Sequence, residues 1–135
     1  MKKTPVVHFE MPYEDSKRVA EFYSKAFGWN MQIMGGDYKD YVLAVTTESN
    51  DHTGRPKDPG AINGGFLKKD DENNVTSVVI AVEDIEEALK DIEAAGGKIL
   101  HRPSEIPGIG MWAVFIDSEG NRVSLLKPSP MDMKK

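Results

Sequence analysis

The chain carries an internal repeat, and a repeat constrains the fold more than any single motif does. Asp15 and Asp84 each stand between a strand-like run and a helical pattern, and they are 69 residues apart (84 − 15). Gly28 and Gly97, which close the two helical patterns, have the same separation (97 − 28 = 69). A common offset at both ends of a helix predicts two copies of one structural unit.

Each copy opens with a strand and continues with an amphipathic helix. The runs 6–11 and 75–82 are rich in β-branched residues, which predicts buried or half-buried strands. The apolar spacing of four and three residues predicts one apolar stripe on each helix, Val19, Tyr23 and Ala26 in the first and Ala88, Ile92 and Ala95 in the second. We also expect Phe22 and Phe27 in the core.

The helix ends are signalled by residues that suit caps. Asp15 and Asp84 are suitable N-caps, and Glu87 three residues after Asp84 completes a capping box. Gly28 and Gly97 suit the left-handed residue that follows a helix.

Three strand-like segments follow each helix, so each copy is a βαβββ module and the fold class is α+β. The segments are 29–34, 41–46 and 61–67 in the first copy and 98–101, 111–116 and 122–127 in the second, with a hairpin loop at 117–121. We expect a single domain over 1–135, with module one at 5–67, a linker at 68–74, module two at 75–127 and a tail at 128–135. A half of this size could hardly bury a helix and a sheet alone, so we expect the halves to share a core.

Composition narrows the classes of partner. A net charge of −5 and a pI near 5.2 provide no basic field for nucleic acid or an anionic membrane. The chain has no cysteine, which excludes disulfides, thiol nucleophiles and cysteine-ligated zinc. The first residues are not followed by an apolar stretch long enough for a signal peptide or membrane span, so we expect a cytoplasmic protein.

Short segments along the whole chain carry a family resemblance. They are Val-His-Phe-Glu-Met-Pro at 7–12, Phe-Tyr at 22–23, Phe-Gly-Trp at 27–29, Pro-Gly-Ala-Ile-Asn-Gly-Gly at 59–65, Ala-Val-Glu-Asp-Ile at 81–85, Ala-Ala-Gly-Gly at 94–97 and Asp-Ser-Glu-Gly-Asn at 117–121. Because these segments occur in this order, the chain resembles the vicinal oxygen chelate superfamily, also called the glyoxalase, bleomycin-resistance and dioxygenase group. The resemblance implies paired modules that form an open, cup-shaped mixed sheet with the helices outside, a ligand site inside the cup, and a homodimer.

The resemblance also implies four places for metal ligands, on the first and last strands of each module. His8 occupies the first place, and the offset (8 + 69 = 77) puts Ser77 at the second. Ser124 stands where the family has a glutamate, and the remaining place falls near Gly64 or Gly65. Because a divalent ion needs about three good donors, His8 alone makes an incomplete metal site, and no cofactor is certain.

His8 and Glu10 are two residues apart, so in a strand they share the face opposite Val7, Phe9 and Met11. A carboxylate beside an imidazole can serve as acid and base or bind a polar substrate; a structural hydrogen-bonded pair is the alternative. We expect His52 and His101 in solvated loops, without a role.

Aromatic residues complete the candidate site. Trp29, Tyr38, Tyr41 and Trp112, with Met111, could reach the cavity, with core packing as the alternative, and alternation leaves the faces of Met111 and Trp112 open. The predicted ligand-binding set is therefore His8, Glu10, Trp29, Tyr41, Ser77, Trp112 and Ser124.

Two functions fit these residues. The first is a bleomycin-resistance-like protein that binds a small apolar or aromatic compound. The alternative is a glyoxalase-type lyase or isomerase in which His8 and Glu10 are catalytic, with or without a weakly bound divalent metal.

Overall fold

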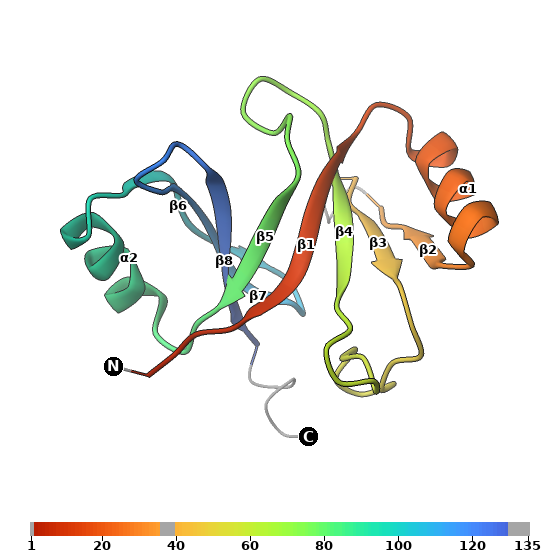
Figure 1. Ribbon diagram of the computed structural model, residues 1–135, viewed down its shortest axis with the longest axis horizontal. Coiled ribbons are helices and arrows are strands. Elements are labelled where there is room, and N and C mark those ends of the chain that lie inside the picture. Colours follow the sequence, from red (N-terminus) through yellow and green to blue (C-terminus); the bar gives the residue numbers. More distant parts are fainter. Residues whose placement is uncertain (1, 36–39, 130–135) are drawn as a thin grey trace. The chain divides into compact units, whose positions relative to one another are not determined.

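The computed structural model describes residues 2–35 and 40–129, and its elements follow the predicted order (Figure 1). Tyr38 and the tail from residue 130 onward lie outside the described residues. Neither described helix is long and apolar enough to cross a membrane. The described elements are β1 (Val6–Tyr13), α1 (Ser16–Phe27), β2 (Asn30–Ile33), β3 (Val42–Val45), β4 (Asn63–Lys68), β5 (Ser77–Ala81), α2 (Ile85–Ala94), β6 (Lys98–Ile106), β7 (Gly110–Ile116) and β8 (Arg122–Pro128).

The chain is α+β with two βαβββ modules, as the sequence predicts. It divides into two compact units. One is His8–Thr76, here called the first module; the other runs from Ser77 onward and includes the N-terminal residues up to Val7, here called the second module. Within the second module, the Ala81 N–H donates to the Pro5 carbonyl at 3.0 Å, which ties the N-terminal residues to the end of β5.

In the first module the described strands are ordered β2-β3-β4-β1, with β1 parallel to β4 and the other pairs antiparallel. Helix α1 packs on one face of this sheet (Figure 1). The cluster between them contains Phe9 and Met11, which confirms the predicted orientation of β1 and turns His8 and Glu10 to the opposite face. Its buried members are Tyr13, Val42, Ala44 and Phe66.

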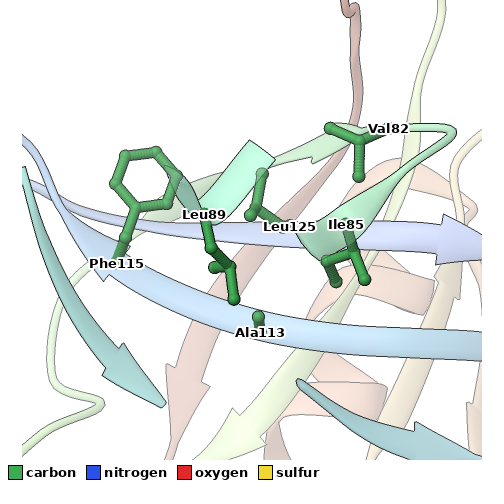
Figure 2. Close-up of a cluster of buried hydrophobic side chains, with 6 residues drawn as sticks. All are labelled: Val82, Ile85, Leu89, Ala113, Phe115 and Leu125. Atoms are coloured by element: carbon green, nitrogen blue, oxygen red, sulfur yellow. The ribbon is translucent and has the colours of Figure 1, made fainter. Parts of the chain in front are cut away.

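In the second module the described strands are ordered β5-β8-β7-β6, with β5 parallel to β8 and the other pairs antiparallel. Helix α2 buries Ile85 and Leu89 against this sheet. Figure 2 shows these two side chains converging with the rest of the buried cluster, Val82, Ala113, Phe115 and Leu125.

The buried apolar residues under each helix form a cluster of their own. In the described part of the chain one such cluster lies in each module, because each helix covers one face of its own sheet. Val79 and Val114 are also buried but belong to neither cluster, and a core shared by the two halves stays a prediction.

The predicted caps are confirmed at three of the four helix ends. The Arg18 and Glu87 N–H groups donate to the carboxylates of Asp15 and Asp84, each at 3.0 Å. Gly28 is left-handed, with φ of 73°.

At the end of α2 the prediction was wrong by one residue. Gly96 takes the left-handed conformation, with φ of 101°. Gly97 instead serves close packing, because a Cβ there would lie 2.7 Å from Ile92 Cγ2.

Two aromatic residues of α1 are more exposed than predicted. Tyr23 packs in the cluster and stacks on Trp29 with ring centroids 4.7 Å apart, but Phe22 is 57% exposed and Phe27 is 63% exposed. Phe22 is rotated about 100° from Tyr23 around the helix axis. Phe27 is the last helical residue, and Trp29, whose ring centroid lies 6.0 Å from that of Phe27, packs against the cluster instead.

Strand β6 is longer than predicted, and this corrects the expectation for His101. The strand continues through Pro103 to Ile106 because β6 is the edge strand of its module and its register with β7 shifts on both sides of His101. His101 is therefore a half-buried strand residue rather than a solvated loop residue.

Candidate functional site

Strand register brings the first-module candidates together on the face opposite α1, here called the helix-free face of that module. His8 pairs with Asn63 and Glu10 pairs with Gly65, which in turn pairs with Leu43. Tyr41 is two residues before Leu43 and its carbonyl accepts from the Met34 N–H at 2.9 Å, so it continues the same strand and side. His8, Glu10 and Tyr41 therefore share this face.

Gly65 is what allows Tyr41 to approach Glu10. A Cβ on Gly65 would collide with the Tyr41 hydroxyl, so the tyrosine side chain lies across β4 at this glycine. Burial raises the pKa of Tyr41 well above its ordinary value of 10.0, and the negative charge of Glu10 raises it further. Tyr41 is thus a neutral hydrogen-bond donor near Glu10, which is only 5% exposed.

His8 is also held in its neutral form. Burial lowers its pKa from 6.5, and the positive charge of Arg55 lowers it further. The helix-free face of the first module therefore combines a neutral imidazole, a buried carboxyl group and a neutral phenol, a set that can accept and donate hydrogen bonds or move a proton.

Asn63, which sequence reasoning did not select, organises the loop above this face. Its Oδ1 accepts from the Thr46 N–H at 2.8 Å, and its Nδ2 donates to Ser49 Oγ at 2.9 Å and to the Gly54 carbonyl at 3.1 Å. The loop leads directly into Arg55, so these bonds help to place the charge that acts on His8. Asn63 lies two residues before Gly65 in the same strand, so alternation could have predicted the face that its side chain occupies.

The second-module candidates share the face opposite α2, the helix-free face of that module. Ser124 pairs with Val79 on one side and with Val114 on the other. Ser77 is two residues before Val79, and Trp112 is two residues before Val114, so both point to the same side as Ser124. His101 stacks on Trp112 with ring centroids 6.1 Å apart.

The structure resolves the orientation of two residues that the sequence left open. Met111 packs against the α2 cluster, and Trp112 points to the helix-free face. Trp29, by contrast, does not join the candidate site, because it packs in the first-module cluster against Tyr23 and Phe9.

The four places at which the resemblance puts metal ligands do not offer a metal site. The fourth place fell near Gly64 or Gly65, and strand register decides between them. Glu10 and Val79 are equivalent (10 + 69 = 79); Val79 pairs with Ser124 and Glu10 pairs with Gly65, so Gly65 is the equivalent of Ser124. The four places thus carry one imidazole, two hydroxyl groups and a glycine, and the glycine has no side chain that could bind a metal. Among the described residues no three His, Asp or Glu side chains gather in one place, so this donor set does not fit a tightly held divalent ion.

Arg122 is the second residue that sequence reasoning missed. It lies two positions before Ser124 in β8, on the same helix-free face, and only 8% of its surface is exposed. The alternation of side chains along the strand places Arg122 on the same face as Ser124. Sequence reasoning passed over it because an arginine beside a Gly-Asn turn is ordinarily solvated.

Comparison with known proteins agrees with this architecture. Residues 6–125 match the family model of the Glyoxalase/Bleomycin resistance protein/Dioxygenase superfamily. The anthracycline biosynthesis protein DnrV of Streptomyces peucetius is 27% identical over 135 residues, a match that covers 92% of this chain and 47% of DnrV. The chain therefore spans about half the length of that curated relative.

Solved structures of methylmalonyl-CoA epimerases share the fold. A variant of the Streptomyces coelicolor enzyme superposes with a TM-score of 0.67 at 14% identity, covering 96% of this chain and 97% of that one. The Mycobacterium tuberculosis enzyme gives a TM-score of 0.67 at 12% identity, covering 96% and 91% of the two chains. At such identities the likeness establishes the fold alone.

Proposed function

The chain belongs to the Glyoxalase/Bleomycin resistance protein/Dioxygenase superfamily, and from that premise we propose that it binds a small apolar or aromatic molecule without a tightly held metal ion. The observation that carries this proposal is the donor set on the helix-free faces. Of the four places at which the resemblance puts metal ligands, His8 provides an imidazole, and the other three carry two hydroxyl groups and a glycine.

These groups suit an organic ligand. Tyr41 is held neutral and can donate a hydrogen bond, and His8 in its neutral form can either donate or accept one. Trp112, stacked with His101, presents a planar apolar surface of the kind on which aromatic ligands pack. Ligand sites in proteins commonly combine apolar walls with a few placed polar groups in this way.

The test is to titrate the protein with a library of planar aromatic compounds by calorimetry, in a buffer that contains a chelator. We expect binding to persist with the chelator and to weaken about tenfold, equivalent to about 1.4 kcal/mol, in Tyr41→Phe or His8→Ala. His52→Ala, which changes an exposed loop histidine, is the matched control and should bind as the unchanged protein does. Binding that appears only after zinc, nickel, manganese, iron or cobalt is added would refute the proposal.

A proton-transfer enzyme of the isomerase or lyase type is the second candidate, and the buried Glu10 near the neutral Tyr41 favours it. In such a reaction the Glu10 carboxylate would take a proton from carbon next to a carbonyl. The Tyr41 O–H would donate a hydrogen bond to the oxygen on which negative charge develops.

This second candidate can be tested with methylmalonyl-CoA, the ligand of an epimerase with the same fold. In deuterated water, mass spectrometry should detect deuterium at the carbon between the two carbonyl groups. Glu10→Gln should reduce the rate at least about a hundredfold, since a positioned general base contributes on that order. Exchange at the same rate in Glu10→Gln and in the unchanged protein would remove Glu10 from the mechanism.

A further inference from the structure

Two buried side chains of the second module hold hydrogen-bond donors that nothing in the described chain uses. The Nε and Nη1 atoms of Arg122 are buried and have no hydrogen-bond partner among the described residues. The Oγ of Ser77 is likewise buried and unpartnered within the described part of the molecule. A buried guanidinium is a charge that ordinarily requires an anion or several hydrogen-bond acceptors.

Strand register brings these two residues together. Strands β5 and β8 are parallel, and Val79 pairs with Ser124. Ser77 and Arg122 each stand two residues before that pair, so they occupy neighbouring positions on the helix-free face of the second module. Ile116, the partner of Arg122 on β7, is apolar, so the facing position on that strand supplies no carboxylate.

The repeat shows what this position does in the other module. Asn63 precedes Gly65 by two residues, as Arg122 precedes Ser124, and Asn63 is therefore the equivalent of Arg122 (124 − 65 = 122 − 63 = 59). The Asn63 amide is used internally, in bonds to Thr46, Ser49 and Gly54. Arg122 has a larger and charged donor group at the same place, and the described chain gives it no such task.

We propose that Arg122 and Ser77 form an oxyanion-binding site, which takes a carboxylate or phosphate group carried by a small organic ligand. A guanidinium and an oxyanion form charge-assisted hydrogen bonds, which are stronger than bonds between neutral groups. The hydroxyl of Ser77 adds a neutral donor beside the charge. The inference goes beyond the function proposed above, which gives Arg122 no role, and it can fail while binding at Tyr41 and His8 stands.

The first experiment follows the Nε–H resonance of Arg122 by nitrogen-15 NMR. The chain has four arginines, so the signal is assigned from its loss in Arg122→Lys. Benzoate and inorganic phosphate are titrated separately, with benzamide as the uncharged control for benzoate. We expect at least one of the two anions to shift the Arg122 resonance in a saturable way, and benzamide to leave it in place. Saturation by benzoate alone identifies a carboxylate site, and saturation by phosphate alone identifies a phosphate site.

Variants provide the affinity test. Arg122→Gln should weaken binding of that anion at least about tenfold, and Ser77→Ala about threefold, because a charged donor contributes more than a hydroxyl. Arg102→Gln, at an exposed arginine of β6, is the matched control and should bind normally. No saturable shift with either anion, or equal affinity in Arg122→Gln, would overturn the proposal.

A stability measurement separates a ligand-binding arginine from a structural one. In anion-free buffer, Arg122→Met should unfold at the same temperature as the unchanged protein or higher, since an apolar side chain replaces a buried charge whose Nε and Nη1 atoms have no partner among the described residues. Adding the anion should raise the unfolding temperature of the unchanged protein and leave that of Arg122→Met where it was. Strong destabilisation by Arg122→Met in anion-free buffer would assign Arg122 to the scaffold and refute the proposal.

Discussion

Gly65 shapes the first-module site through the side chain it lacks. Adjacent residues Gly64 and Gly65 each leave room for an aromatic side chain, Phe9 on the α1 side and Tyr41 on the helix-free side. A Cβ on Gly64 would lie 2.6 Å from the Phe9 ring. Neither glycine has positive φ, so their importance lies in space rather than in backbone conformation.

Replacement of Gly65 by alanine should therefore be costly. The new methyl group must displace the Tyr41 hydroxyl, and we expect Gly65→Ala to lower the free energy of unfolding by about 1–3 kcal/mol, the usual cost of overpacking. Chemical denaturation measures this change. Gly35→Ala is the control, because a Cβ at Gly35 meets nothing within 4 Å. Equal stability of the two variants would mean that Tyr41 does not pack over Gly65.

At the scale of elements, the two helices depend on the same kind of N-cap but differ in their first turns. Asp15 and Asp84 each accept a backbone N–H at 3.0 Å. Helix α2 also carries Glu86 and Glu87 in its first turn, where negative charge interacts favourably with the helix dipole, and α1 has no acidic residue there.

Removal of either cap should destabilise the protein to a similar extent. We expect Asp15→Ala and Asp84→Ala each to lower the free energy of unfolding by about 1 kcal/mol, since a backbone donor loses its partner. Asp91→Ala, in the last turn of α2, is the matched control and should cost less, because no N-cap is lost. Caps that cost no more than Asp91→Ala would show that packing alone sets where these helices begin.

Element order could be predicted because its signals are local. Caps and apolar spacing fixed both helices, and strict alternation in β1 gave the correct face for His8 and Glu10. The length of β6 could not be predicted, since Pro103 indicates a break unless the strand is known to be at an edge.

The candidate site was only partly predictable, because burial depends on neighbours far away in sequence. Alternation could not show which face Trp112 occupies, because β7 is apolar on both faces. The register of β7 with β8 determines that face. Arg122 was missed because its charge suggests solvent, whereas packing within the sheet leaves it 8% exposed.

At the scale of the whole molecule, the titration of buried groups links stability to pH. The folded state lowers the pKa of His8 below 6.5, so between that lower value and 6.5 the unfolded chain binds more protons. Stability therefore rises with pH through this window and is lost as pH falls through it. Tyr41 acts in the opposite sense: its pKa is raised in the folded state, so the unfolded chain loses its proton first above 10.0, and stability falls as pH rises further.

We therefore expect the free energy of unfolding, measured by denaturant titration across the pH range, to be highest between about pH 6.5 and 10 and to decline on both sides. His8→Gln should flatten the acid side below pH 6.5, because the titrating imidazole is gone. Tyr41→Phe should flatten only part of the alkaline decline, because burial and Asp40 also raise the pKa of Tyr13, which acts in the same direction. An acid slope that survives in His8→Gln would show that His8 takes up its proton as readily in the folded protein as in the unfolded chain. The assignment of a neutral imidazole to the first-module site would then be refuted.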